Sequence, residues 1–266
     1  ANDDDVIELD KDYVMANDEK PIFINKTLTI DGKGFTLDAN HLNATLVAMS
    51  KISLKDIVFI NGNCAEEFSI GGYYARGTVN VIRGSDGSTI DNCTFKDNDA
   101  LMGGGIYWSS NEGTLTNSIF ESNVALRSDS PSSSSTTSQG GAVYWSGDNG
   151  KIDNCNFTEN SASYSGGAIY YQGADNQLIT NSNFYRNVDN RYGANSGGGA
   201  IYFASSNFGR IVNTNFTENS VRGSGGAVYI DKNSKNQSIS DSTFTNNTAD
   251  GLSSNAGAPS ASYGGG

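Results

Sequence analysis

IDNCNFTENSASYSGGAIYY, residues 152–171, is the stretch of this chain that decides the fold, because both halves of it recur along the sequence. The first half reads apolar-x-Asn-small-x-Phe-x-x-Asn, and the second half reads Gly-Gly-small-Ile/Val-Tyr-aromatic. A repeat with a period of about 20–50 residues indicates a solenoid, a propeller or another repeat array. The spacing of the two motifs therefore distinguishes among these folds.

The two motifs alternate strictly along the chain. The first occurs at residues 90–98, 115–123, 152–160, 179–187, 211–219 and 239–247, with a weaker copy at 54–59. The second occurs at residues 103–108, 140–145, 166–171, 198–203 and 225–230, with a degenerate copy at 77–81. The step from each second glycine to the next phenylalanine is 16–18 residues, whereas the step from each phenylalanine to the next second glycine varies from 9 to 21. Each repeat thus contains a module of fixed length and a corner that tolerates insertions.

This spacing predicts an all-β fold, a right-handed parallel β-helix (solenoid). The shortest repeat is about 25 residues, which suits three short strands and their bends at about 3.3 Å per strand residue. Propeller blades need about 40–45 residues, and a β-sandwich has hairpin turns without a repeat register. Both alternatives fit the pattern less well.

Stacked coils bring equivalent residues into columns. Asparagine tolerates the left-handed conformation at bends, and asparagines in equivalent slots can form a side-chain ladder. The expected internal aromatic stack contains Phe95, Phe120, Phe157, Phe184, Phe216 and Phe244. The expected asparagine ladder contains Asn98, Asn123, Asn160, Asn187, Asn219 and Asn247.

The small slot two residues before each phenylalanine should also face the interior, because strand side chains alternate. It holds Cys93 and Cys155, which lie two coils apart. Two coils span about 10 Å, beyond the disulfide reach of about 7 Å. We therefore expect both to be buried free thiols; the third cysteine is Cys64, and an odd, low count does not indicate a disulfide framework.

The repeats divide the chain unevenly. Residues 1–60 contain short alternating strands and are expected to form the N-terminal cap and first coils, with residues 10–20 covering the first coil. Residues 61–266 contain the β-helix coils with the GGA(I/V)Y and FxxN repeats. The final residues 262–266 resemble the approach to a Gly-Gly corner at 163–167, so we expect a fragment of a longer array, truncated at its C-terminal end.

Composition excludes several classes of partner. The chain has 17 Lys and Arg against 29 Asp and Glu, a net charge of −12. An acidic surface repels phosphate backbones and anionic lipid, so we expect no nucleic acid partner. The chain has no apolar run of about 18 residues, so we expect no membrane insertion in this fragment.

The paired motifs resemble the repeat of the chlamydial polymorphic outer-membrane proteins. The segment INKTLTIDGKG at residues 24–34, with the acidic and Asn/Ser/Thr-rich composition, is more similar to the adhesin-like surface proteins of methanogenic archaea. The resemblance covers nearly the whole chain. It implies an extracellular, archaeal cell-surface protein that mediates attachment, and it brings no catalytic residues.

Two features are candidates for the binding surface. The first is the insertion corner, represented by Arg127, Asp129, Arg191 and Tyr192, with neutral drift at a tolerant corner as the alternative. The second is a set of tyrosines between inward-facing residues of the Gly-Gly strand, expected to point outward and to be exposed, as is Asn80 in the degenerate copy. Stacking that merely stabilises the sheet is the alternative. The tyrosines are Tyr107, Tyr144, Tyr170, Tyr202 and Tyr229.

Catalysis has little support in the sequence. Polysaccharide lyases and hydrolases need clustered carboxylates, and the nearest candidates, Asp31 and Asp38, are residues that commonly cap turns. The single histidine, His41, lies in an expected turn. We expect no enzyme and no resident cofactor. Binding of Ca²⁺ by Asp and Asn oxygens at the bends is an alternative, although the sequence contains no EF-hand loop.

Sequons for glycosylation are frequent. They begin at Asn25, Asn43, Asn92, Asn156, Asn215, Asn236 and Asn246.

Three functions remain in order of preference. The first is a cell-surface adhesin fragment that binds a glycan or protein of another cell through a lateral face. The second is a structural surface-layer or stalk component, and the third is a polysaccharide lyase or hydrolase.

Overall fold

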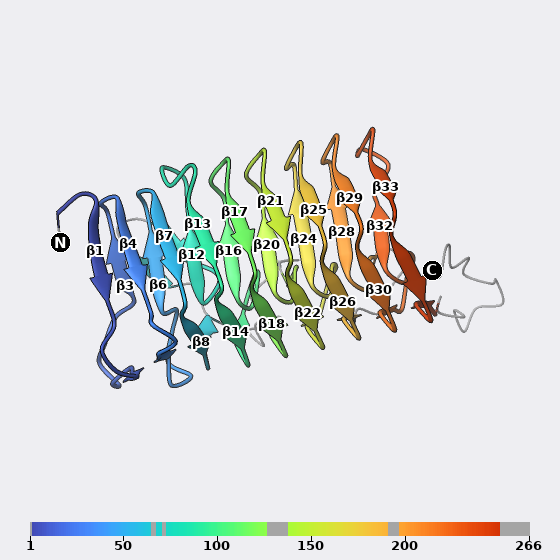
Figure 1. The fold of residues 1–266 in the computed structure, drawn as a ribbon. Coiled ribbons are helices and arrows are strands. Elements are labelled where there is room, and N and C mark those ends of the chain that lie inside the picture. Colours follow the sequence, from blue (N-terminus) through green and yellow to red (C-terminus); the bar gives the residue numbers. More distant parts are fainter. Residues whose placement is uncertain (1, 65–67, 71–72, 127–137, 191–196, 251–266) are drawn as a thin grey trace.

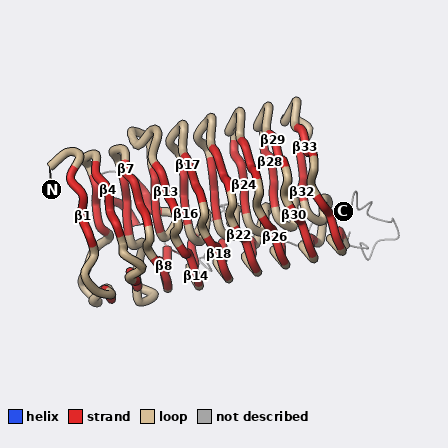
Figure 2. Tube along the Cα trace, viewed as in Figure 1, coloured by secondary structure: helices blue, strands red, loops and turns tan. Residues whose placement is uncertain are grey.

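The structure is a computed structural model and describes residues 2–64, 68–70, 73–126, 138–190 and 197–250. The described residues form short strands separated by turns, without helices (Figure 2). Successive coils stack side by side from the N-terminal to the C-terminal end of a rod (Figure 1). The predicted all-β parallel β-helix is confirmed.

A single coil shows how the repeat folds. It begins with β16 (Ile106–Trp108) and continues through β17 (Thr114–Thr116), β18 (Ile119–Glu121) and β19 (Val124–Ala125). Each strand pairs in parallel with the equivalent strands of the coils before and after it. The fourth strand was not predicted, because two residues are too few to show an alternating pattern.

Four parallel sheets therefore run along the rod. Sheet A contains β1 (Asp5–Glu8), β4 (Leu28–Asp31), β7 (Ile52–Lys55), β13 (Thr89–Asp91), β17, β21 (Lys151–Asp153), β25 (Leu178–Thr180), β29 (Arg210–Val212) and β33 (Ser238–Ser240). Sheet B contains β2 (Tyr13–Val14), β5 (Thr36–Asp38), β8 (Val58–Ile60), β14 (Thr94–Lys96), β18, β22 (Asn156–Thr158), β26 (Asn183–Tyr185), β30 (Asn215–Thr217) and β34 (Thr243–Thr245).

The other two sheets complete each coil. Sheet C contains β3 (Ile22–Ile24), β6 (Leu46–Ala48), β12 (Val79–Val81), β16, β20 (Val143–Trp145), β24 (Ile169–Gln172), β28 (Ile201–Ala204) and β32 (Val228–Ile230). Sheet D contains β9 (Asn63–Cys64), β15 (Asp99–Ala100), β19, β23 (Ser161–Ala162), β27 (Val188–Asp189), β31 (Ser220–Val221) and β35 (Thr248–Ala249). Between β9 and β12, the strands β10 (Phe68–Ile70) and β11 (Tyr73–Ala75) form an antiparallel hairpin.

The core is a set of columns along the rod axis. The phenylalanines of sheet B pair in register from Phe59 to Phe244, and their neighbouring ring centroids lie 4.7–5.0 Å apart. Sheet A adds buried aliphatic residues such as Ile152, and sheet C adds Trp108 and Trp145, whose rings stack at 4.5 Å. Offset stacking of this kind adds about 0.5–1.5 kcal/mol per pair to the apolar burial.

The six ladder asparagines lie at the turn between sheets B and D. From Asn98 to Asn219, each Nδ2 donates to the Oδ1 of the asparagine in the next coil over 2.9–3.0 Å. Each also donates to the phenylalanine carbonyl of the preceding coil. The ladder therefore satisfies buried backbone groups at a corner that has no regular strand pairing.

The Gly-Gly corner requires glycine for two separate reasons. Gly140 has a φ of +67°, in the left-handed region. Gly141 lies against the next coil, where a Cβ atom would come 2.1 Å from the carbonyl oxygen of Gly167. The first glycine is thus needed for conformation and the second for close approach of backbones.

Candidate ligand-binding face

The outer side of sheet C carries a continuous row of stacked tyrosines, here named the tyrosine column. Flanking residues such as Ile106 and Trp108 belong to the main core, whereas the tyrosines between them do not. Neighbouring rings pair in register with centroids 4.9–5.6 Å apart. Its members are Tyr107, Tyr144, Tyr170, Tyr202 and Tyr229.

The predicted exposure of these tyrosines is wrong at the centre of the column. Tyr144 and Tyr170 retain only 7% and 6% of their accessible surface. The stacked neighbours cover both ring faces, and Met102 and Ala204 pack with them in a smaller apolar cluster. Burial is the main cause that raises the pKa of both phenols. The half-buried members are Tyr107, Tyr202 and Tyr229, so a ligand has access mainly toward the ends.

The predicted exposure of Asn80, one coil before the column, is also wrong. Asn80 is fully buried because its side chain binds the backbone. Its Oδ1 accepts hydrogen bonds from the amides of Arg76 and Gly77 over 2.8 and 3.1 Å. Its Nδ2 donates to the carbonyls of Leu46 and Gly77. Asn80 therefore fixes the segment that leads from the hairpin into β12.

Two depressions lie along the tyrosine column, one toward each end. The first has a volume of about 330 Å³ and the second about 470 Å³. The first depression is lined by residues that include Tyr74, Arg76, Arg83, Tyr107, Ser109 and Ser146. The second depression is lined by residues that include Tyr164, Tyr170, Tyr202, Tyr229, Asp231 and Lys232. Aromatic side chains beside a few polar groups are the usual lining of small-ligand sites.

The insertion corner adjoins this face. The connection from sheet D to sheet C runs directly into the strand that carries each tyrosine, as between β19 and β20. The first long connection contains the hairpin β10–β11, which brings Tyr74 to the first depression. The loop residues named from the sequence, Arg127, Asp129, Arg191 and Tyr192, lie outside the described residues.

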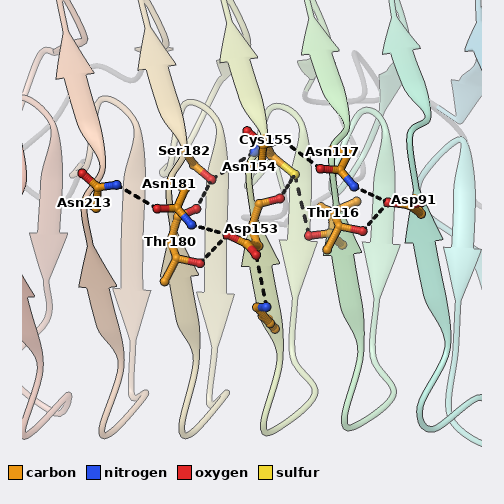
Figure 3. A network of polar contacts seen from close by, with 12 residues as sticks. Asp91, Thr116, Asn117, Asp153, Asn154, Cys155, Thr180, Asn181, Ser182 and Asn213 are labelled. Atoms are coloured by element: carbon orange, nitrogen blue, oxygen red, sulfur yellow. Dashed lines mark hydrogen bonds and ion pairs between the residues drawn. The ribbon is translucent and has the colours of Figure 1, made fainter.

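The opposite corner, between sheets A and B, carries a polar network on the surface (Figure 3). Its asparagines, the first Asn of each repeat, have φ between 50° and 53° at Asn92, Asn117, Asn154, Asn181 and Asn213. Asn154 Nδ2 donates to Asn117 Oδ1, and Asn213 Nδ2 donates to Asn181 Oδ1, both over 2.8 Å. These asparagines hold the turns together from coil to coil.

Carboxylates of sheet A belong to the same network. Asp153 accepts hydrogen bonds from Thr180 Oγ1 and Asn181 Nδ2, both at 2.7 Å, and pairs with Lys151 at 3.2 Å. The Thr180 hydroxyl is the main cause that lowers the pKa of Asp153. Each of these polar groups is engaged within the stack, so the network acts as a structural brace.

The two candidate catalytic carboxylates serve separate turns. Asp31 accepts a bond from the Lys33 amide and pairs with Lys33 and Lys55. Asp38 accepts from the Asn40 amide at 2.7 Å. His41 is exposed in a turn with a φ of +57°. Among the described residues, no group of three or more His, Cys, Asp or Glu side chains is arranged to hold a metal ion.

The thiols are buried and free. Cys64, Cys93 and Cys155 form no disulfide, which confirms the prediction for the last two. Burial raises the pKa of each thiol to about 12. Low-pKa, exposed thiols are the reactive ones, so these three pack as small apolar residues.

Most sequon asparagines are on the surface. Asn25, Asn92, Asn156, Asn215, Asn236 and Asn246 are exposed, and Asn43 is half-buried. The Nδ2 of Asn215, to which a glycan would attach, donates to Asn183 Oδ1 at 2.9 Å in an outward ladder on sheet B. Glycosylation there would replace one of its two N–H donors, and modification stays a prediction.

Comparison with known proteins identifies the repeat. The family model described as a right-handed β-helix region matches residues 77–262. The search of curated proteins found no match to the chain. The part of the chain that the structure describes contains no helix long and apolar enough to span a bilayer.

Proposed function

The chain belongs to the right-handed β-helix family, and from this premise we propose that it is the binding rod of a cell-surface adhesin. In this proposal the rod is displayed outside the cell and attaches to glycans of another cell through the tyrosine column. The β-helix fold is compatible with adhesins, with other surface proteins and with proteins that act on polysaccharides. The choice among them depends on the tyrosine face.

The observation that carries the proposal is the position of the tyrosine column. Core packing already uses the inner residues of sheet C, yet a second aromatic row stands on the outer side beside two depressions. The apolar face of a sugar ring packs well on an aromatic ring, while the phenol hydroxyl bonds the sugar hydroxyls. Because stacked neighbours cover the ring faces within the column, the row offers ring edges and phenol hydroxyls at about 5 Å spacing along the rod.

The test is glycan-array binding with three proteins. The wild-type chain is expected to retain a defined set of glycans. Tyr229→Ala, which removes a half-buried ring at the second depression, is expected to weaken binding of that set about tenfold, the equivalent of about 1.4 kcal/mol. Tyr185→Ala is the matched control, because Tyr185 is a half-buried tyrosine on sheet B, outside the column.

The outcomes separate the alternatives. Equal loss in both variants, or none in either, would contradict binding through the tyrosine column. A folded wild-type protein that retains no glycan would favour a structural stalk, which the continuous phenylalanine and asparagine ladders also suit. Release of new reducing or unsaturated ends from a polysaccharide would favour an enzyme.

A further inference from the structure

The first depression concentrates positive charge on an acidic protein. The chain has a net charge of −12, yet the described residues that line this depression include Arg76 and Arg83 and no carboxylate. The second depression, in contrast, has Asp231 beside Lys232. The two depressions along one tyrosine column therefore differ in charge.

Arg76 is held in place before any ligand arrives. Its backbone amide is fixed by the buried Asn80 side chain at 2.8 Å. Its guanidinium lies over the Tyr107 ring, 5.8 Å from the centroid, and Nη1 is 3.3 Å from Met102 Sδ. The ring and the Met102 sulfur restrain the guanidinium, whose planar fork of N–H donors is pre-organised to match a carboxylate. Little side-chain freedom remains to be lost on binding.

Neither arginine of the first depression has an ion-pair partner in the part of the chain that the structure describes. Among the described residues, the ion pairs involve neither Arg76 nor Arg83. Arg83 is exposed just after the end of β12. An arginine fork matches a carboxylate in geometry, and such charge-assisted bonds are about twice as strong as neutral ones. An anion is therefore the natural occupant.

The remaining lining fits a sugar ring attached to that anion. Tyr74 is 50% exposed and presents aromatic surface. Tyr107 is half-buried between Arg76 and Tyr144 and presents its ring edge. Ser109 and Ser146 add half-buried hydroxyls. The volume of about 330 Å³ is at the lower end of the range for small-ligand pockets, about 300–1,000 Å³.

We propose that the first depression binds a pyranose that carries a carboxylate, with Arg76 and Arg83 on the carboxylate and with Tyr74 and the edge of the Tyr107 ring against the sugar. This inference rests on the proposed function, because it names the class of sugar that the tyrosine face selects. The acidic surface elsewhere on the rod repels such sugars, so selection occurs at this depression.

The test compares two disaccharides by isothermal titration calorimetry. Cellobiouronic acid and cellobiose differ only in whether C6 of one glucose is a carboxylate or a hydroxymethyl group. The wild-type chain is expected to bind the acid at least about tenfold more tightly, with a preference that declines as salt is added. The double variant Arg76→Gln, Arg83→Gln is expected to lose the preference.

Two further variants, one at each depression, complete the test. Arg83→Gln alone changes an exposed residue, so the fold is retained, and about half of the logarithmic preference should be lost. Lys232→Gln removes one positive charge at the second depression and should leave the preference unchanged.

The inference is overturned if the wild-type chain binds both disaccharides equally, binds neither, or keeps its preference in the double variant. Its failure is separate from failure of the proposed function. Glycan-array binding that depends on Tyr229 but not on sugar charge would refute the acidic-sugar assignment and leave glycan binding intact.

Discussion

The Nδ2 of Asn160 donates one hydrogen bond of 3.0 Å to Asn187 Oδ1 in the next coil and another of 3.0 Å to the Phe120 carbonyl in the preceding coil. The Oδ1 of Asn160 accepts from the backbone amide and the Nδ2 of Asn123. One fully buried amide group thus connects three coils. Among uncharged side chains, only glutamine, which is one methylene longer, offers the same two donors and acceptor in one plane.

Asn160→Ala is expected to destabilise the rod by about 3 kcal/mol or more. The substitution leaves two buried donors of Asn123 without their acceptor, at about 1–3 kcal/mol for each, and removes one hydrogen bond to the Phe120 carbonyl. Asn156→Ala, four residues earlier, removes an exposed acceptor of Asn183 Nδ2 and should cost only about 0.5 kcal/mol. Urea unfolding followed by circular dichroism measures both. Equal costs would show that the internal amides do not hold the coils together.

Gly141→Ala is expected to disrupt the corner between coils. The new Cβ would lie 2.1 Å from the carbonyl oxygen of Gly167 and 2.6 Å from the backbone nitrogen of Ser161. Backbone atoms cannot rotate away, so adjacent coils must separate, at a cost of about 3 kcal/mol. Thermal unfolding measures the loss.

Gly173→Ala, in the turn between β24 and β25, is the comparison variant. Gly173 has a φ of +61°, and no atom lies within 4 Å of the position that a Cβ would take. Only the left-handed strain remains, about 1 kcal/mol. A larger loss at Gly173 than at Gly141 would contradict the assignment of close backbone approach to the second glycine of the motif.

The fold was predictable because every coil repeats the same environments. Phe157 and Phe184 recur in one slot, and strand alternation then places Cys155 on the same inner side. Stacking in register follows from the near-constant distance between glycine and phenylalanine. The direction of the tyrosine column was predictable by the same alternation.

The burial of Tyr144 and Tyr170 was not predictable in this way. Alternation gives the side of the sheet toward which a residue points, but the exposed fraction depends on the rings in the coils above and below. The clue was present in the sequence, since Met102 and Ala204 are apolar residues near that outer side. The exposure of Asn80 was mispredicted for a related reason. Its side-chain amide binds the backbone at a position where the later coils have tyrosine.

The first depression was missed entirely. Tyr74 and Arg76 belong to an insertion with an antiparallel hairpin, which occurs once and so lacks a repeat partner. Arg83 follows the degenerate copy of the Gly-Gly strand. A repeat pattern contains only what the coils share, whereas this candidate site lies where one coil differs from the others.

Alkaline pH is expected to destabilise the rod through its buried thiols. The pKa of Cys93 and Cys155 is raised from 9.0 to about 12 in the folded state. The unfolded chain therefore loses protons first, and stability falls as the pH rises from about 9 to about 12, by about 1.4 kcal/mol per pH unit for each thiol. Urea midpoints at a series of pH values measure this slope.

Serine at both positions should flatten the slope without loss of the fold. Ser118 and Ser182 occupy the same slot in neighbouring coils, where each hydroxyl accepts the backbone amide of a cysteine at 3.1 Å. Cys93→Ser, Cys155→Ser is therefore expected to fold and to show a smaller decline above about pH 9. An unchanged slope would place the alkaline sensitivity in Cys64 and the buried tyrosines instead.

Acid is expected to act on the first coils through Asp31. Its side chain is 3% exposed, and Oδ2 lies 2.7 Å from Lys55 Nζ and 3.0 Å from Lys33 Nζ. The hydrogen bond from Lys55 is the main cause that holds the pKa of Asp31 well below its usual value. A lowered folded pKa means that the stabilisation is present above about pH 4 and is lost as the pH falls below it.

Asp31→Asn should therefore be less stable than wild type at pH 7, and this difference should narrow steadily as the pH is lowered from about 5 to about 2. Hydrogen exchange in β1, β4 and β7, which pair through this residue and its neighbours, measures the difference locally. In the wild-type background, Lys55→Met should also lower the stability at pH 7, by an amount that becomes smaller as the pH falls. In the Asp31→Asn background it should cause no further loss, because the two substitutions remove one interaction. A gap that stays constant with pH would show that the ion pairs of Asp31 contribute nothing to the N-terminal coils, and that their strand pairing alone holds them.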